Sequence, residues 1–321
     1  MKRMQFDERS VSVVVALALL VGAGTTLLAQ RPEPTVELVE RGLGPEDFPQ
    51  INRLADNVYV YSDVHTQGEV TTNNLIVITS EGVLVADGQG RPEQTARLVA
   101  EIRALTDQPI RYVVVASHHG DHTGGNVEFP DTATFIAHPT SQAAMEAAAS
   151  RPARGGGPNQ VVVPTETVAD RRVLDLGGTE IQILHLGRSH TGGDLAVYLP
   201  AQRILHMSET FYNRMFPSMG GGYPSEWIAA IERAEAMDVD VYIPGHGFVD
   251  DPATLSAEVT MFRRALERVV AEGTRLHAAG VPVEEASTQA DLGEFADFSI
   301  SEQMAPGAIA RVYAELNGEL D

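Results

Sequence analysis

The chain has no cysteine among its 321 residues. Disulfide bonds and thiolate metal ligands are therefore excluded, and any metal site must be built from His, Asp and Glu side chains, with other oxygen donors as weaker ligands. Because a chain without cysteine suits oxidising and reducing compartments equally well, this absence does not indicate where the protein acts.

Positive charge is also scarce. The sequence has 23 Lys and Arg against 44 Asp and Glu, which gives a formal net charge of −21 at pH 7. This charge repels the phosphates of nucleic acids and of anionic lipids, so we expect neither a nucleic acid nor an anionic membrane surface as a partner. The hydrophobic content of 43% is typical of a folded globular protein, and the length suffices for one large domain or two small ones.

One long apolar run stands near the N-terminus. Basic residues within positions 2–9 precede an apolar run from Val11 to Ala29, which ends in small residues. This pattern predicts a signal peptide over residues 1–29, and therefore a periplasmic or secreted protein. The alternative is an uncleaved membrane anchor, because about 18 apolar residues can nearly span a bilayer. A membrane is then a partner only if this segment is retained.

The remaining chain divides into three expected parts. Residues 30–55 form an N-terminal arm, which is rich in Pro and Glu up to residue 50, residues 56–250 form the main domain, and residues 251–321 form a C-terminal helical extension. The expected strands are Val58–Ser62, Leu75–Thr79, Val83–Asp87, Arg111–Ala116, Thr134–Ala137, Arg172–Leu176, Glu180–Leu186, Leu195–Leu199, Arg203–His206 and Val239–Ile243. The expected helices are Pro92–Thr106, Pro139–Ser150, Ser225–Met237, Pro252–Ala279 and Ala308–Leu316, and residues 211–224 are expected to form a loop.

The order of these elements indicates an α/β fold. Strands followed by a helix occur in two successive halves, which favours two sheets packed face to face with helices outside, a four-layer αββα sandwich. The pattern by itself establishes only the α/β class.

The strongest chemical signal is the sequence S-H-H-G-D-H at residues 117–122, directly after the expected buried strand Arg111–Ala116. Loops at strand ends are where rigid scaffolds hold functional side chains. Imidazole and carboxylate ligands together suit Zn²⁺, Fe or Mn. The motif therefore predicts a metal site that includes His119, Asp121 and His122.

Two further histidines stand in similar contexts. His190 lies in G-R-S-H-T-G-G-D at residues 187–194, and His246 lies in P-G-H-G at residues 244–247. Both are in glycine-containing turns after expected strands. A single histidine of this kind is usually structural, but three histidine-bearing turns of one type predict joint metal ligation.

Together these motifs resemble the metallo-β-lactamase superfamily over about residues 56–250. Its hallmarks are H-x-H-x-D-H, a His in a G-H-T-x-G-D-like turn, an acidic residue after a strand and a His in P-G-H. The resemblance implies the αββα sandwich and a hydrolase with one or two metal ions. It implies that His119 and His190 serve the first metal, that Asp121, His122 and His246 serve the second, that Glu209 bridges both, and that Asp87 orients ligands.

The sequence departs from the family pattern at two positions. Ser117 replaces the first His of H-x-H-x-D-H, so the first metal loses an imidazole ligand and gains at best a weak hydroxyl. His118 is adjacent, but a shift of one residue in an extended segment turns a side chain away. Glu209 replaces the bridging Asp, and its extra methylene moves the carboxylate.

Other residues are weaker candidates, and alternatives stay open for each. His138 is expected either to orient a ligand or to cap a helix, while His185, His206 and His277 are interpreted as structural. His65 is a candidate for the rim of a substrate site or else an exposed residue. Tyr212, Arg214 and Tyr223 are candidates for contact with the substrate, with loop packing or a solvated charge as the alternative.

The chemistry implied by the resemblance is metal-assisted hydrolysis of a small-molecule substrate. One or two Zn²⁺ ions per chain, with Fe or Mn as alternatives, lower the pKa of bound water to about 7, and the resulting hydroxide attacks a carbonyl carbon. Asp121 holds this nucleophile and moves a proton. A β-lactam, a lactone and another small ester or amide all fit. The competing hypothesis is a non-catalytic metal-binding or sensor protein, because Ser117 weakens one site.

Overall fold

The computed structural model describes residues 35–64, 71–152 and 160–320 of the chain. The expected signal peptide and His65 lie outside the described residues. Among the helices that the structure describes, none combines the length and the hydropathy needed to cross a membrane.

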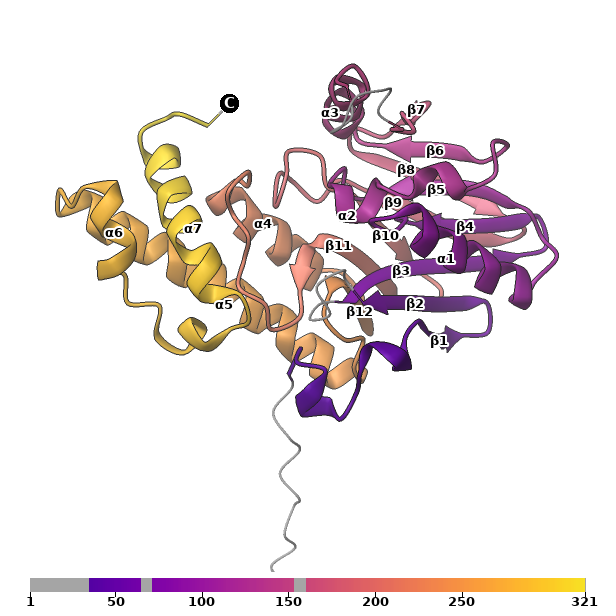
Figure 1. Ribbon diagram of the computed structural model, residues 1–321, viewed down its shortest axis with the longest axis horizontal. Coiled ribbons are helices and arrows are strands. Elements are labelled where there is room, and N and C mark those ends of the chain that lie inside the picture. The colour runs from indigo at the N-terminus through magenta and orange to yellow at the C-terminus, as the bar shows by residue number, and fades with distance from the viewer. Residues whose placement is uncertain (1–34, 65–70, 153–159, 321) are drawn as a thin grey trace, which may run out of the picture. The chain divides into compact units, whose positions relative to one another are not determined.

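The described strands form one curled, mixed sheet with two halves (Figure 1). The first half contains β1 (Gln50–Ala55), β2 (Val58–Val64), β3 (Thr71–Thr79), β4 (Gly82–Ala86), β5 (Ile110–Val115), β6 (Thr134–Ala137) and β7 (Glu166–Thr167). The second half contains β8 (Arg171–Leu176), β9 (Thr179–Leu184), β10 (Ala196–Leu199), β11 (Ile204–Tyr212) and β12 (Val241–His246). The halves are joined where β3 and β12 pair at Thr72 and His246.

The two halves pack on each other through their inner faces. Leu84 of β4 and Val114 of β5 belong to one buried cluster with Ile183 of β9 and Val197 of β10. Successive residues of a strand point to opposite faces. Runs such as Val113–Val115 are continuously apolar because the outer face of the strand is covered as well.

Helices cover both outer faces. The helices are α1 (Pro92–Leu105), α2 (Gly120–Thr123), α3 (Pro139–Ala149), α4 (Pro224–Glu235), α5 (Pro252–Ala278), α6 (Val283–Gln289) and α7 (Ser301–Leu316). Val85 and Val113 pack with Leu98 of α1 on the first half. Met207 of β11 packs with Trp227 of α4 on the second half. The four-layer order helix, sheet, sheet, helix confirms the predicted fold class.

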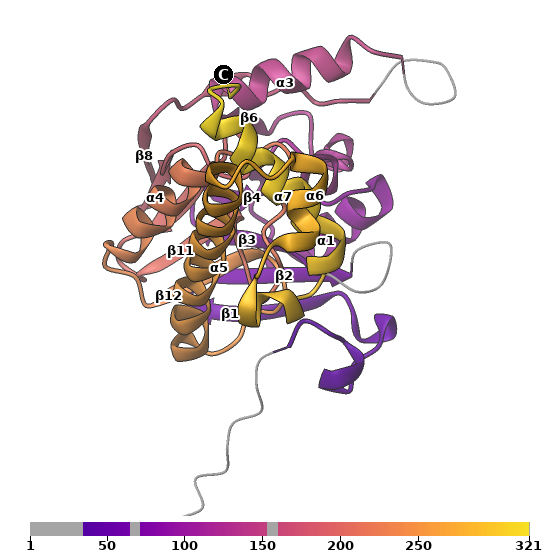
Figure 2. The same cartoon turned by 90° about the vertical axis from the view of Figure 1, so that its left-hand side faces the viewer.

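The helices after the last strand form the predicted C-terminal extension. Asp251 caps α5 by accepting hydrogen bonds from the backbone N–H groups of Ala253 and Thr254, and Pro252 occupies the first helical position. Figure 2 looks onto α5, α6 and α7 with the strands behind them. The buried face of α5 belongs to the same core as β11 and α4.

Two differences from the expected elements, in β11 and β12, bear on the site. β11 continues to Tyr212, whereas the sequence predicted its end at His206, because the polar run Ser208–Thr210 reads as a loop although it is buried. β12 likewise extends to His246. The helix α6 was not expected, and β1, which lies within the expected N-terminal arm, pairs with β2.

Candidate metal centre

The side chains predicted as metal ligands meet where several chain segments converge. They lie on the α2 segment that follows β5, in the turn between β9 and β10, and on β11 and β12. They form two groups, and within each group one ligand atom per residue lies within 4.8 Å of the others. The first cluster is His119, His190 and Glu209, and the second cluster is Asp121, His122, Glu209 and His246.

The second cluster has the spacing of a tetrahedral site. Asp121 Oδ2 lies 3.2 Å from His246 Nε2 and 3.6 Å from His122 Nε2, and the two imidazole nitrogens are 3.3 Å apart. Glu209 Oε1 lies 3.4 Å from His246 Nε2 and 3.6 Å from His122 Nε2. Ligands placed tetrahedrally at zinc–nitrogen distances are separated by about 3.3 Å. The four donors therefore fit a zinc ion without rearrangement of their segments.

The first cluster has three donors and is tighter. His119 Nδ1 and His190 Nε2 are 2.8 Å apart, and Glu209 Oε2 lies 2.9 Å from the former and 3.0 Å from the latter. Three protein ligands with one open position are typical of catalytic zinc sites. These atoms fit a cation only after they move apart by a few tenths of an ångström.

A bulge in β11 places Glu209 between the two clusters. The pairing of β11 with β12 shifts register between His206 and Ser208, and Ser208 has a positive φ of 46°. A Cβ at Gly245 of β12 would lie 2.5 Å from the carbonyl carbon of Ser208, so only glycine permits this close approach. The bulge directs one carboxylate oxygen of Glu209 to each cluster.

Asp87 orients the second cluster from the end of β4. Its Oδ2 lies 3.0 Å from His122 Nδ1 and accepts a hydrogen bond from Ser208 Oγ at 2.6 Å. Its Oδ1 accepts from the backbone N–H of Ala116 at 2.8 Å. Because Nδ1 of His122 donates to Asp87, Nε2 is left to face the cluster. This is the role that the resemblance implies for Asp87.

His190 is oriented by groups that the sequence did not reveal. Its Nδ1 lies 2.8 Å from the backbone carbonyl oxygen of Ser218 and 2.8 Å from the hydroxyl of Tyr212. A carbonyl can only accept, so Nδ1 carries the proton and Nε2 faces the first cluster. Tyr212 is thus buried behind His190, so of the two roles expected for it the structure shows packing and not a place at the open face. No sequence signal identifies a backbone carbonyl such as that of Ser218.

Asp194 shapes the turn that carries His190. Its carboxylate accepts hydrogen bonds from the backbone N–H of Thr191 at 2.6 Å and from the hydroxyls of Ser189 and Thr191 at 2.7 and 2.6 Å. An Asp that bonds nearby backbone and hydroxyl groups in this way fixes a turn. The T-G-G-D part of the motif therefore holds the backbone on both sides of His190.

The fold and the paired clusters agree with the comparison against known protein families. A family model described as the Metallo-beta-lactamase superfamily matches residues 68–246, which is more than half of the chain. The chain belongs to the metallo-β-lactamase superfamily. The family resemblance seen in the motifs is thereby confirmed.

Individual members of the superfamily are distant from this chain. Metallo-beta-lactamase type 2 of Bacillus sp. (strain 170) is 25% identical over 212 residues, covering 64% of this chain and 79% of that protein. The alpha subunit of 2,4-dinitroanisole O-demethylase of Nocardioides sp. (strain JS1661) is 28% identical over 141 residues, covering 43% and 41%. A solved metallo-beta-lactamase from Pontibacter korlensis superposes with a TM-score of 0.58 at 20% identity, covering 68% of this chain and 99% of its own. The structural likeness shows the fold alone.

This superfamily member differs from the family motif at Ser117, and the structure shows what the serine does. Ser117 is fully buried, and its hydroxyl donates a hydrogen bond of 2.6 Å to Glu209 Oε2, the oxygen that faces the first cluster. The neighbouring His118 places Nδ1 3.2 Å from the hydroxyl of Ser141 and belongs to neither cluster. Ser117 therefore holds the shared carboxylate, and His118 does not replace the missing histidine.

The buried charges of the two clusters depend on one another. Burial opposes the negative charge of Glu209, but His190 and His122 outweigh it and hold the pKa of this carboxyl well below its usual range. Burial likewise opposes a proton on His246, yet hydrogen bonds with Asp121 and Glu209 raise its pKa to about 9. Protons thus occupy imidazole nitrogens that a metal cation would take over.

The site opens on the side of His119 and Asp121. Their side chains are 39% and 26% exposed, whereas the other four predicted ligands are almost completely buried. A cavity of about 140 Å³ adjoins Asp121 and is lined by polar side chains, among them Gln89 and Arg91. Among the described residues, the two clusters are therefore most accessible on the face of His119 and Asp121.

The remaining candidates lie outside the clusters. Arg214 pairs with Glu258 at 3.5 Å, and Tyr223 lies with its ring 4.0 Å from the guanidinium of Arg188. His138 precedes α3 and accepts a hydrogen bond from the backbone N–H of Thr140, so of the two roles expected for it the structure shows helix capping. His65 lies outside the described residues.

Proposed function

We propose that the protein is a zinc-dependent hydrolase that cleaves a small ester, lactone or amide. The observation that carries this proposal is the second cluster, whose four donors are spaced for a tetrahedral zinc ion beside an open face. Iron and manganese also accept imidazole and carboxylate ligands and are tested alongside zinc. β-Lactams are included as substrates because distant relatives of this fold are named metallo-beta-lactamases.

Each part of the chain has a defined task in this proposal. Asp121, His122, Glu209 and His246 hold the second ion, and His119, His190 and Glu209 hold the first. A bound zinc ion lowers the pKa of a water molecule to about 7, which supplies a nucleophile at neutral pH. Asp121 has a partly exposed carboxylate next to the open face, where it would accept the proton of the attacking water and pass it to the leaving group.

The test is turnover with and without metal. Protein treated with a chelator and then reloaded with zinc, iron or manganese is assayed on a chromogenic cephalosporin, a homoserine lactone and a p-nitrophenyl ester. We expect hydrolysis of at least one class, lost on chelation and restored by metal. A protein that binds metal tightly but hydrolyses none of these classes supports the sensor hypothesis and contradicts the proposal.

Two substitutions separate binding from catalysis. Asp121→Asn keeps an oxygen ligand but removes the proton acceptor, so we expect bound metal to be largely retained and turnover to fall by about 10²–10⁴-fold. Asp175→Asn is the control, because it makes the same exchange at an exposed carboxylate that accepts a hydrogen bond from the backbone N–H of Gly178 between β8 and β9 and belongs to neither cluster. Unchanged turnover in Asp121→Asn would show that Asp121 does not move the proton.

We also propose that the protein is exported, on the pattern of residues 1–29 in the sequence. N-terminal sequencing of the protein secreted by its host is expected to begin near Gln30. An intact Met1 on protein from the soluble cytoplasmic fraction excludes export, and an intact Met1 in the membrane fraction identifies an uncleaved anchor.

A further inference from the structure

Residues 213–223, here called the site loop, connect β11 to α4 and touch the first cluster from behind. The loop supplies the Ser218 carbonyl that accepts the proton of His190 Nδ1. Near its end, the backbone N–H of Tyr223 donates to the carbonyl of Ser189 at 2.9 Å. A Cβ at Gly222 would lie 2.9 Å from the same Ser189 oxygen. The loop is thus pressed against the turn that carries His190.

An arginine of the C-terminal extension forms hydrogen bonds with the site loop at this point. Nε of Arg311 on α7 donates to the carbonyl of Gly222 at 2.6 Å, and Nη2 lies 3.4 Å from the carbonyl of Gly221. The guanidinium also lies 5.5 Å from the centre of the Tyr223 ring. Hydrogen bonds from a charged donor are stronger than neutral ones. Arg311 therefore contacts Gly222 and Tyr223, the two residues by which the loop meets the His190 turn.

The extension holds the site loop at two more places. The backbone N–H of Phe216 donates to the carbonyl of Ser299 at 3.0 Å, next to a parallel bridge between Met215 and Ser299. Directly after the loop, Ser225 donates from its N–H and hydroxyl to Glu315 of α7, at 3.1 and 2.8 Å. The loop is fixed near both ends by residues beyond position 298.

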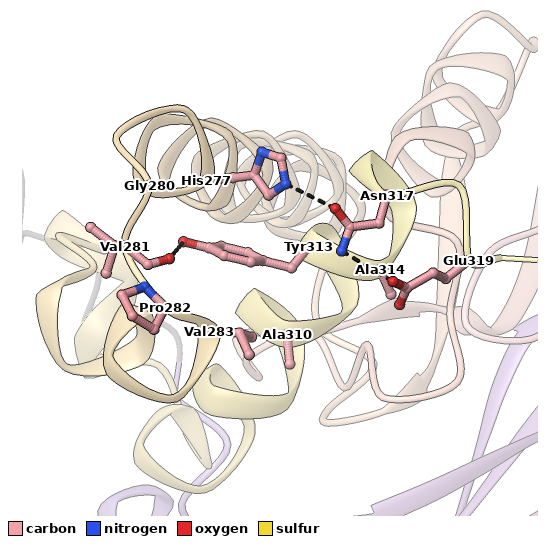
Figure 3. Close-up of a pocket in the computed structure, with 10 residues that line it drawn as sticks. All are labelled: His277, Gly280, Val281, Pro282, Val283, Ala310, Tyr313, Ala314, Asn317 and Glu319. Carbon is pink, nitrogen blue, oxygen red and sulfur yellow. Dashed lines mark hydrogen bonds between the residues drawn. The ribbon is translucent and has the colours of Figure 1, made fainter.

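The helix α7 is itself firmly anchored (Figure 3). The hydroxyl of Tyr313 donates to the carbonyl of Val281 at 3.0 Å, and His277 Nε2 lies 3.0 Å from Asn317 Oδ1. These bonds lie beside a hollow of about 540 Å³, which is lined by residues from the end of α5 to the start of α6 and by residues in and just after α7. They tie α7 to α5 and to the segment between α5 and α6, so the helix that carries Arg311 is held at two places.

We infer that the C-terminal extension helps to orient His190 in the metal centre and that Arg311 is the positioning residue through which it does so. Arg311 holds Gly221 and Gly222, the loop then keeps the Ser218 carbonyl in place, and this carbonyl fixes the direction of His190 Nε2. The extension lies beyond residues 68–246, which the family model matches. The expected effect of Arg311 on metal binding rests on the proposed function, whereas its hydrogen bonds to the site loop do not.

The first test measures the site loop in metal-free protein. Arg311→Met keeps the length and packing of the side chain and removes its hydrogen-bond donors. We expect amide hydrogen exchange at Gly222 and Tyr223 to become about tenfold faster, the effect of losing a hydrogen bond from a charged group. The control is Arg264→Met, which removes an extension arginine that pairs with Glu294 and does not contact the loop. Equal exchange rates in Arg311→Met and wild type overturn the inference.

The second test measures metal binding. We expect calorimetric titration of Arg311→Met with Zn²⁺ to show that the affinity of the first cluster is about tenfold lower than in wild type, as for the loss of a group that orients a ligand. The affinity of the second cluster should be unchanged. The absorption spectrum of the Co²⁺-loaded protein should change in Arg311→Met, remain normal in Arg264→Met and recover in part in Arg311→Lys, which retains one donor group. An unchanged first cluster and spectrum overturn the link to His190, even if the loop exchanges faster.

Each of the two tests can contradict its own claim without deciding the other. If wild-type protein binds no metal, the proposed function fails, while amide exchange still decides whether Arg311 holds the site loop. If Arg311→Met does not fold, Arg311→Gln is measured in its place, because glutamine is too short to reach both carbonyls. If amide hydrogen exchange at Gly222 and Tyr223 is as slow in Arg311→Gln as in wild type, the inference is overturned in the same way.

Discussion

Replacing Ser117 by alanine removes the hydroxyl that donates to Glu209 and that also accepts a hydrogen bond of 3.4 Å from the backbone N–H of His119. The bond to Glu209 is short, at 2.6 Å, and both residues are buried. A hydrogen bond to a charged acceptor contributes about 1.5–3 kcal/mol. Glu209 keeps its contacts with the histidines of both clusters, so we expect Ser117→Ala to lower the free energy of unfolding of metal-free protein by about 1.5 kcal/mol, the lower end of this range.

Urea unfolding in the presence of a chelator measures this change. The matched control is Ser141→Ala, which also removes a buried hydroxyl, but one that donates to the neutral carbonyl of Gly193 at 2.8 Å. Its expected cost is about 0.5–1 kcal/mol. If Ser117→Ala costs no more than Ser141→Ala, the serine does not hold the shared carboxylate, and its hydroxyl is available to the first metal instead.

The remaining predictions concern metal binding. His122→Ala and His246→Ala should each abolish tight binding at the second cluster, and full metal content by mass spectrometry in either variant would contradict the assignment. Because the pKa of His246 is raised to about 9 and that of His122 is raised well above its usual value, binding at pH 7 must displace at least one proton, so the affinity measured by calorimetry should rise by at least about tenfold per pH unit from pH 7 to about pH 9; an affinity independent of pH would exclude this competition. Ser117→His should bring a third imidazole to the first cluster and raise bound metal toward two per chain, and no increase would show that the buried position cannot hold the larger side chain.

The sequence predicted the ligand set better than the elements that carry it. The motifs at residues 117–122 and the turns around His190 and His246 identified the side chains that the structure brings together. Their spacing in the sequence sufficed because each lies at or just after the end of a strand, and strand ends meet at one edge of a sheet. The assignment of these side chains as metal ligands stays a prediction until metal is measured.

The course of β11 could not be predicted. Ser208, Glu209 and Thr210 are polar residues in succession, and such a run is typical of a loop. In the structure they are buried because they face Asp87, the two clusters and the His190 turn, where every polar group finds a partner. The chemistry of the site, rather than local propensity, sets the length of this strand.

The groups that orient His190 could not be predicted from the sequence for a related reason. The sequence identified a C-terminal extension, but its contact with the site depends on tertiary packing of α7 against the site loop. Arg311 bonds to backbone carbonyls, and the Ser218 oxygen is itself a backbone atom. Backbone acceptors are the same at every residue, so no residue type marks them.

Calorimetric titration of metal-free wild-type protein with Zn²⁺ tests the central claim most directly. The second cluster offers four donors at the spacing of a tetrahedral ion, and the first offers three donors held closer together. We therefore predict two binding events, with the tighter one lost in His122→Ala and the weaker one retained. Absence of zinc binding would contradict the metal centre itself, and loss of the weaker event in His122→Ala would contradict the division into two clusters.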